Sequence, residues 1–292
     1  MTARLAPSRC GMRHAALPMD AFAPAGEAHA APTGSWWHNG GVSVFQTIRH
    51  AFAPADPNAI RVPVVLHAPA GAVPITLRTM TADDEDAWNE VRWRNDDWLR
   101  PWESGDPMHG HGITFNQWLV MQRRNEERGC GVVLLIEHRM RIVGQISIGA
   151  ITYGAMRTGI VGYWVSQDVA GHGIAPTALA MLADWAMGDP TGPRLHRLEI
   201  AILPENARSL AVVRKVGARP EGLRANYMYV AGRWRSHETF SLLAEDMGAG
   251  FTARLLDGAA SASPRPATPP NPARHIDTPL RNADNVTPVS YS

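Results

Sequence analysis

A glycine-containing segment, Gly171-His172-Gly173-Ile174-Ala175, lies between a predicted strand and a predicted helix. A turn of this kind leaves backbone N–H groups unpaired at the start of the helix, where the helix dipole adds positive potential. Such a turn is suited to bind phosphate, so the segment is a candidate pyrophosphate site. Short glycine motifs also occur in ordinary strand-to-helix connections, where they serve only the turn geometry. His172 is either a further phosphate contact or an exposed loop residue.

A carboxylate lies on the next predicted strand, His196–Ile202. Alternation along this strand puts Glu199 on the face of Arg197, opposite its apolar neighbours. Glu199 is therefore a candidate general base in a cleft, or one half of an ion pair with Arg197 on a solvated face. Further along, Asn206 precedes a predicted helix and Ser209 lies in its first turn, and both positions are typical of helix caps.

The elements that position these residues follow from hydrophobic periodicity. Their order is βααβββαβαββ, which indicates one α/β (α+β) domain over residues 74–247. Strands are expected at 75–80, 132–137, 141–151, 159–165, 196–202, 227–230 and 237–243. Helices are expected at 81–95, 114–128, 176–187 and 207–216.

The segments outside this domain have a different composition. Residues 1–35 and 248–292 are rich in Ala and Pro and lack hydrophobic periodicity. They cannot bury enough apolar surface to offset the entropy of ordering, so disordered N-terminal and C-terminal tails are expected. Residues 36–73 are expected to hold an accessory helix at Ser43–Phe52 and a linker.

The two loop motifs together resemble those of the GNAT acetyltransferase superfamily, and within it the RimJ-type ribosomal-protein N-acetyltransferases. The family's phosphate loop, Arg/Gln-x-x-Gly-x-Gly/Ala, is similar to Ala170-x-x-Gly173-x-Ala175, with Ala170 in place of Arg or Gln. The family's next motif, Asn-x-x-Ser-x-x-x-x-x-Lys-x-Gly, is similar to the segment from Asn206 to Gly217. The likeness continues in residues 95–103, 195–197, 222–224 and 232–237.

The resemblance implies the GNAT fold, a mixed and mostly antiparallel sheet with helices on both faces, and acetyl-CoA as co-substrate. It implies that Gly171 to Ala175 hold the pyrophosphate. Where two strands splay apart, backbone groups near Trp164 and Val165 would bind the pantetheine and polarise the carbonyl. Asn206 would hydrogen-bond the pantetheine arm, and Ser209 would donate a proton to the departing thiolate. The Ala170 replacement removes one side-chain contact to phosphate.

The connection after the first domain helix carries the predicted acceptor site. In the resembling family it forms a wall of the acceptor groove, and here it contains Asp97, Trp98, Trp102 and Glu103. The carboxylates favour a cationic amine, and the indoles offer flat apolar surface for the first side chains of a peptide. Alternatively, both Trp are core residues and the acids solvate a helix end.

The acceptor is expected to be the N-terminal α-amino group of a protein, for example a ribosomal protein. An α-amine with a pKa of ~7.7–8.0 is about a tenth neutral at pH 7, whereas a Lys amine at ~10.4 is almost wholly protonated. The absence of an obvious strong base thus favours the α-amine. Two alternatives stay open: acetylation of a small amine such as an antibiotic or amino sugar, and a catalytically silent acetyl-CoA-binding module.

Composition excludes several other classes. Lys and Arg total 28 against 27 Asp and Glu, so no basic field favours direct nucleic acid or membrane binding. The two cysteines do not form a disulfide framework, and no apolar stretch approaches the ~20 residues of a membrane span. The 12 histidines lack metal-site spacing, so no metal is expected. A soluble, cytoplasmic monomer or homodimer is expected.

Overall fold

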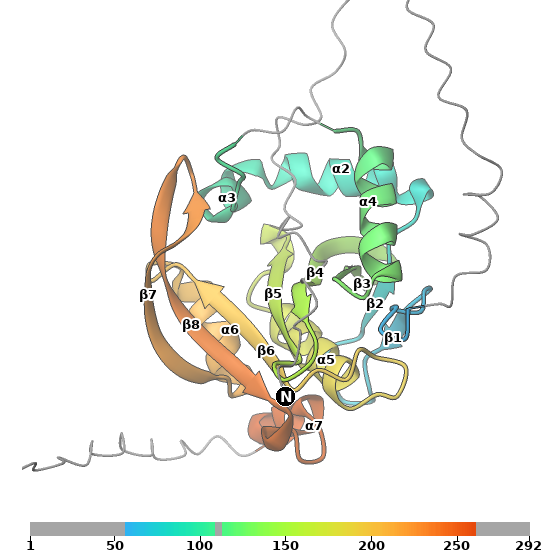
Figure 1. Ribbon diagram of the computed structural model, residues 1–292, viewed down its shortest axis with the longest axis vertical. Coiled ribbons are helices and arrows are strands. Elements are labelled where there is room, and N and C mark those ends of the chain that lie inside the picture. The colour runs from blue at the N-terminus through green and yellow to red at the C-terminus, as the bar shows by residue number, and fades with distance from the viewer. Residues whose placement is uncertain (1–55, 109–112, 261–292) are drawn as a thin grey trace, which may run out of the picture.

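The computed structural model describes residues 56–108 and 113–260, and within them the strands form one sheet (Figure 1). The strand order is β1-β2-β3-β4-β5-β6-β8-β7, and all neighbours are antiparallel except β5 and β6, which are parallel. The mixed, mostly antiparallel sheet predicted from the sequence is confirmed. The strands are β1 (Val65–His67), β2 (Ile75–Thr79), β3 (Val132–His138), β4 (Arg141–Thr152), β5 (Thr158–Val165), β6 (Arg197–Ile202), β7 (Arg219–Val230) and β8 (Arg233–Leu243).

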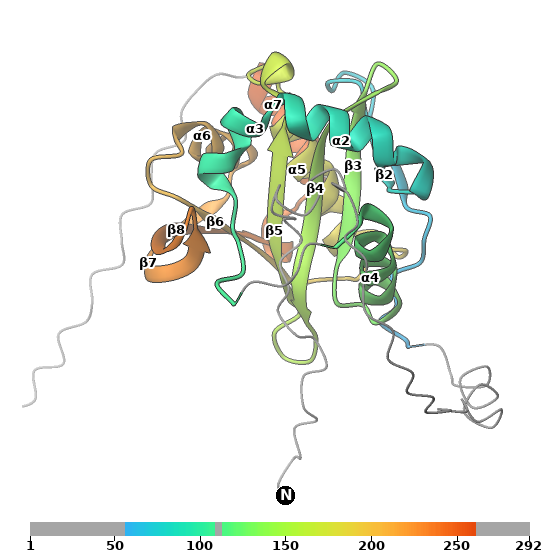
Figure 2. The same ribbon diagram turned by 90° about the horizontal axis from the view of Figure 1, so that it is seen from above.

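Helices cover both faces of the sheet. They are α2 (Glu85–Arg94), α3 (Asp96–Leu99), α4 (Phe115–Glu127), α5 (Ile174–Met187), α6 (Ala207–Val216) and α7 (Phe251–Ala260). The central strand β3 is apolar on both sides: Leu134 and Ile136 enter a core with α5 and α6, while Val133 and Leu135 enter a second core with α2 and α4. Figure 2 shows α2 and α4 on the near side of the sheet and α5 on the far side. The α/β layering predicted from the element order is therefore confirmed.

Two predicted helix starts are present with their threonine caps. The Thr114 hydroxyl accepts the backbone N–H of Gln117 at 3.3 Å, and the Gln117 side chain accepts the N–H of Thr114 at 2.9 Å. At the other start, the Asp84 carboxylate accepts the N–H of Thr81 at 2.7 Å. Each reciprocal arrangement supplies acceptors for N–H groups that a helix start leaves unpaired.

Strands β5 and β6 separate along their length, which opens the sheet near its middle (Figure 1). Their parallel pairing runs from Thr158 with Arg197 to Val161 with Ile200. From residue 162 to 165, β5 pairs only with β4, whereas β6 continues beside β8. The opening leaves main-chain groups of one strand without a strand partner, so they are available to a ligand.

The terminal hairpin is longer than the sequence predicts. Strands were expected at 227–230 and 237–243, but β7 and β8 extend over Arg219–Val230 and Arg233–Leu243. Most β7 side chains are exposed, so the strand lacks the apolar alternation that reveals a half-buried strand. The pairing shifts register between Arg224 and Met228, which marks a bulge next to the open part of the sheet.

The ordered part also extends beyond both expected domain boundaries. Strand β1 lies in the segment predicted to be a helix and linker, and it pairs with β2. The prediction of a disordered tail from residue 248 is wrong for α7, because Phe251 is fully buried in the main core. The Asp184 carboxylate of α5 accepts the N–H groups of Phe251 and Thr252 at 2.6 and 3.0 Å. The predicted accessory helix at 43–52, and the predicted tails 1–35 and 261–292, lie outside the described residues.

The described ranges contain no helix long and apolar enough to cross a membrane. In the same ranges, no cluster of three or more His, Cys, Asp or Glu side chains has the arrangement of a metal site.

Candidate active site

The glycine segment forms the start of α5, as predicted. Gly171 and Gly173 have φ angles of +83° and +80°, a left-handed conformation that side chains with a Cβ rarely adopt. Among the described residues, the N–H groups of Gly171, Gly173, Ile174 and Ala175 have no hydrogen-bond acceptor. Four free donors at a helix N-terminus match the requirements of a pyrophosphate, so this chain's residues fit coenzyme A. His172 is exposed in the same turn.

A cavity of about 210 Å³ lies where β5 and β6 separate. Its wall combines residues from β4, β5, β6, α6 and the β7–β8 hairpin with the segment that follows α3. The predicted site residues that line it are Trp102, Glu103, Trp164, Asn206 and Ser209. The fold thus brings together residues from three separate stretches of sequence.

The main chain of β5 faces the opening at alternate residues. Ser166 donates its N–H to the Val143 carbonyl at 2.7 Å, which fixes the phase of the antiparallel ladder with β4. Bonded pairs alternate in such a ladder, so the main-chain groups of Trp164 point to β4. Those of Tyr163 and Val165 point to the side where β6 diverges. Tyr163 therefore takes the place that the sequence analysis gave to Trp164 as a source of free backbone groups.

Trp98 links α3 to the end of β5 by a hydrogen bond. Its indole N–H donates to the Val165 carbonyl at 3.1 Å, and the Arg208 guanidinium lies 3.6 Å from its ring centroid. Trp98 does not line the cavity. Its contacts support the alternative interpretation of this residue as a packing element, whereas Trp102 does line the cavity.

The first turn of α6 carries a hydroxyl pair. The Asn206 side-chain oxygen accepts the Ser209 N–H at 3.1 Å, which is the capping bond that the sequence allows. Its amide NH₂ group has no hydrogen-bond acceptor in the described ranges and is free for a ligand on the cavity side. The Ser209 hydroxyl lies 2.8 Å from the Tyr163 hydroxyl. Burial raises the pKa of Tyr163, so this phenol keeps its proton at neutral pH.

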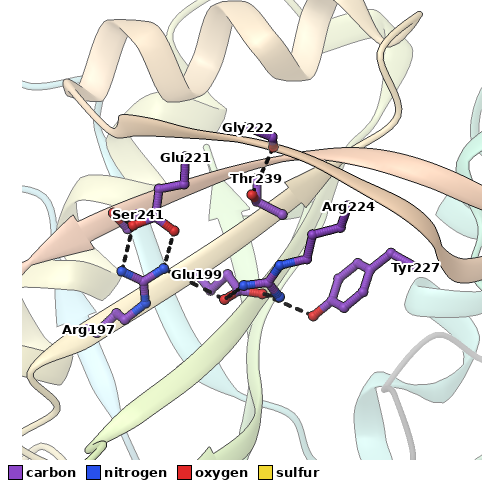
Figure 3. Close-up of polar contacts among 8 residues, drawn as sticks. All are labelled: Arg197, Glu199, Glu221, Gly222, Arg224, Tyr227, Thr239 and Ser241. Atoms are coloured by element: carbon purple, nitrogen blue, oxygen red, sulfur yellow. Dashed lines mark hydrogen bonds and ion pairs between the residues drawn. The ribbon is translucent and has the colours of Figure 1, made fainter. Parts of the chain in front are cut away.

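The Glu199 carboxylate is held by other side chains (Figure 3). It is not among the residues that line the cavity. Both of its oxygens accept hydrogen bonds from the Arg224 guanidinium, and the Tyr227 hydroxyl donates to one of them at 2.9 Å. Arg197, the expected partner, forms an ion pair with Glu199 at 3.7 Å and also makes a two-bond ion pair with Glu221. This geometry favours an anchor for β7 over a general base, because both carboxylate oxygens already accept hydrogen bonds from β7 side chains and the residue is not part of the cavity lining.

The predicted acceptor residues separate into two groups. Glu103 lines the cavity and forms an ion pair with Arg92, whose side chain is buried. The Arg92 guanidinium also lies 5.2 Å from the ring centroid of Trp164. Asp97, by contrast, has an exposed side chain that pairs with Arg100 on the outside of α3. Glu103 therefore lies at the cavity, and Asp97 lies outside it.

The wall that carries Glu103 is attached to the terminal hairpin. Ser104 forms an isolated β-bridge with Val230, and Gly105 donates its N–H to the Tyr229 carbonyl at 2.9 Å. These bonds hold the segment after α3 against β7 and close one side of the cavity. The connection after α3 therefore lines one side of the cavity, and its role in acceptor binding stays a prediction.

Two cavity residues were missed in the sequence, Tyr163 and His237. Tyr163 lies in an apolar strand next to Trp164, and His237 lies in a hairpin with weak periodicity. In the sequence, each is recognisable only as a titratable side chain on a predicted strand. The strand pairing in the folded protein is what shows that both face the same cavity.

Comparisons with known proteins agree with this geometry. A family model described as the acetyltransferase (GNAT) domain matches residues 75–219. The probable N-acetyltransferase YjcK of Bacillus subtilis is 30% identical over 139 residues, which are 48% of this chain and 74% of that protein. The ribosomal protein uS5-alanine N-acetyltransferase of Escherichia coli is 24% identical over 172 residues, 57% of this chain and 87% of that protein. The structure of Mycobacterium smegmatis RimJ in complex with CoA-disulfide has a TM-score of 0.61 and 34% identity, covering 69% of this chain and 96% of that one.

A sheet that opens beside a helix N-terminus with free N–H donors defines a class of acyl-group transferases that use a coenzyme A thioester. The chain belongs to the GNAT acetyltransferase family. It is an acyltransferase, and the reaction is acetyl transfer.

Proposed function

We propose that the enzyme transfers the acetyl group of acetyl-CoA to the N-terminal α-amino group of a protein, a ribosomal protein being the leading candidate. The observation that supports this proposal is a shared cavity. Glu103 and Trp102 line it together with Asn206, Ser209 and Tyr163. A carboxylate and an indole beside the transfer groups suit a charged amine that continues into a peptide. The relatives named as ribosomal-protein alanine N-acetyltransferases and as RimJ support the same acceptor class.

Each residue has a role that follows from its contacts. The N–H groups of Gly171 to Ala175 would hold the pyrophosphate, and the Asn206 amide would donate to the pantetheine arm. The main-chain groups of Tyr163 and the N–H of Val165, whose carbonyl is already bound by Trp98, would bind beside the thioester. Acetyl-CoA, when bound, supplies an acetyl carbon that an unprotonated amine can attack. The Tyr163–Ser209 hydroxyl pair would protonate the departing sulfur.

The acceptor amine must lose its charge before or during attack. An α-amine has a pKa of ~7.7–8.0, so it is only weakly basic and loses its proton readily near neutral pH. A Lys side chain at ~10.4 would need a much larger shift. The natural compartment for such a reaction is the cytoplasm, where acetyl-CoA and newly made proteins are both present.

The proposal is tested by measuring turnover of acetyl-CoA with a panel of amines. The panel contains peptides with free Ala or Ser N-termini, the same peptides with a blocked N-terminus, and small amines such as amino sugars. Turnover with free N-termini is expected. Transfer to the small amines alone would replace the peptide acceptor by a small-molecule one, and coenzyme binding with no turnover would indicate a silent module.

A further inference from the structure

His237 is a cavity-lining residue to which no role has been assigned so far. It lies on β8, is buried to 3% exposure and lines the same cavity as Ser209 and Glu103. Alternation along β8 sends Phe240 and Leu242 into the main core and leaves His237 on the opposite face of the strand. A buried imidazole at a polar cavity is a group whose protonation affects the chemistry there.

The tautomer of His237 follows from its hydrogen bond. Its Nδ1 lies 2.9 Å from the backbone carbonyl oxygen of Arg235. A carbonyl oxygen only accepts hydrogen bonds, so Nδ1 carries the hydrogen. The neutral ring therefore has its lone pair on Nε2, and no described residue donates a hydrogen bond to that nitrogen. Nε2 is thus a free proton acceptor held in a fixed ring orientation.

The groups around His237 keep the ring neutral. Burial lowers its pKa from the usual value near 6.5, and the Arg235 charge acts in the same direction. The hydrogen bond to the Arg235 carbonyl and the Glu205 carboxylate raise the pKa, but less strongly. From β7, the Tyr227 ring meets the imidazole edge-on at 6.1 Å, and Arg224 is the cross-strand partner. The carboxylate nearest to these two, Glu199, is already bound by both.

The other titratable groups lining the cavity do not suit the role of a base. Among the described residues they are Arg92, Glu103 and Tyr163. The Arg92 guanidinium carries only hydrogen-bond donors and has no acceptor for a proton. Glu103 is engaged by Arg92 and is suited to hold an ammonium group, and burial raises the pKa of Tyr163, so that phenol stays protonated and does not act as a base. Among the described residues that line the cavity, His237 is the titratable side chain with a free lone pair in its neutral form.

We infer that His237 is the general base of acetyl transfer and takes the proton of the acceptor amine on Nε2. The inference rests on the acetyl transfer of this enzyme and deepens the proposed function. The acceptor nitrogen forms a bond to the acetyl carbon and the carbon–sulfur bond breaks. One N–H proton passes from the nitrogen to Nε2, and the sulfur receives a proton from the Tyr163–Ser209 pair. The products are an amide and a free thiol. The imidazolium returns its proton to solvent, and the Tyr163–Ser209 pair takes a proton back from solvent, so the enzyme regains its starting protonation.

The test compares His237→Asn and His237→Gln with the wild-type enzyme over pH 5.5–9.5. Asn keeps a side-chain N–H near the Nδ1 position and the bond to the Arg235 carbonyl, but it has no Nε2. Both variants are expected to lower kcat/KM for a peptide acceptor about 100-fold, because positioned general bases contribute roughly 10²–10⁴. The KM for acetyl-CoA is expected to stay unchanged. His196→Gln, an exposed residue paired with Glu245 away from the cavity, is the matched control and should retain full activity.

The pH profile separates a base from a packing residue. In the wild type, two groups must be unprotonated, the amine and His237, so log kcat/KM has a slope of 1 below the pKa of the amine and approaches 2 below the lowered pKa of His237, down to the lowest pH at which the enzyme stays folded. In His237→Asn only the amine remains, so the slope falls to 1. A variant with wild-type rate and slope, in a preparation where the wild type transfers acetyl groups, would overturn the base role alone. A wild type with no amine acetylation would instead contradict the proposed function.

Histidine NMR of the wild-type protein without acetyl-CoA gives a readout independent of turnover. Two-dimensional ¹H–¹⁵N spectra at pH 7, with the His237 ring signals assigned through the backbone assignment of the wild-type protein, should show a neutral ring with hydrogen on Nδ1. A ring protonated at pH 7, or the opposite tautomer, would overturn the inference even if both variants failed to fold.

Discussion

Two acidic residues of one short segment have opposite surroundings. The Glu103 side chain is 18% exposed, lines the cavity and pairs with Arg92, whereas the Asp97 side chain is 95% exposed. Their sequence positions alone made both candidates for the acceptor site. The structure retains only Glu103, because the short helix α3 turns Asp97 away from the wall. A pattern of acids near a helix end therefore identifies the segment but not the functional carboxylate.

Glu103→Gln is expected to raise KM for a peptide acceptor about fivefold, since one partly screened charge contact contributes about 1 kcal/mol. The increase should be greater at low than at high ionic strength, and KM for acetyl-CoA should not change. Asp97→Asn is the matched control with no expected effect on either constant. Steady-state kinetics check this, with thermal melting to show that the Arg92 environment stays folded. Equal changes in both variants would contradict the assignment.

A second residue-scale prediction concerns the hydroxyl pair. Tyr163→Phe and Ser209→Ala are each expected to lower kcat at least about tenfold, because both interrupt proton delivery to the departing sulfur. Tyr153→Phe is the control, since the Tyr153 hydroxyl donates to the Asn58 carbonyl at 3.2 Å outside the cavity. If neither variant changes kcat, then Ser209 acts only within the α6 cap and the hydroxyl pair has no part in the transfer.

At the scale of elements, the decisive feature is the separation of β5 from β6. The sequence predicts both strands and the helix after each of them, because their apolar periodicity is strong. The sequence does not reveal which β5 main-chain groups face the opening. That depends on which residues of β5 are hydrogen-bonded to β4, and the bond from Ser166 N–H to the Val143 carbonyl shows which they are. Nor does the sequence reveal β7, whose exposed side chains lack a pattern. Tyr163 and His237 were missed for the same reason: their proximity depends on register.

The start of α5 gives the element-scale prediction. Gly173 has φ +80°, and a Cβ at this position would lie 3.1 Å from the Val73 side chain. Gly173→Val is expected to weaken acetyl-CoA binding about tenfold or more in calorimetry, because the left-handed conformation costs about 1–2 kcal/mol and the free N–H groups shift. Gly154→Val imposes a similar strain in the β4–β5 turn, where φ is +71° and space is open, and should leave affinity unchanged. Unaltered affinity in folded Gly173→Val would place the pyrophosphate elsewhere.

At the scale of the whole molecule, the ordered unit is larger than the sequence indicates. Composition correctly separates an apolar centre from Ala- and Pro-rich ends, but it assigns α7 to the tail because Ala-rich segments occur in both settings. What orders α7 is tertiary: Phe251 fills the main core, and Asp184 of α5 caps the helix start. Such contacts have no local sequence signature.

Phe251→Ala is expected to lower the free energy of unfolding by about 3–5 kcal/mol, the usual cost of emptying a large aromatic site in a core. Leu223→Ala is the control, because Leu223 is 62% exposed on β7 and its truncation should cost less than about 0.5 kcal/mol. Urea titrations followed by tryptophan fluorescence measure both. Equal stability of Phe251→Ala and wild type would mean that α7 does not belong to the cooperative unit.

The central claim is acetylation of an α-amino group, and tandem mass spectrometry tests it most directly. The purified protein is given acetyl-CoA and one peptide that carries both a free N-terminal α-amine and an internal Lys, at pH 7. The account predicts a single added acetyl group located on the N-terminal residue, because the α-amine is far more often unprotonated than the Lys amine. An acetyl group on the Lys side chain, or an unmodified peptide under conditions where the protein binds acetyl-CoA, would contradict it.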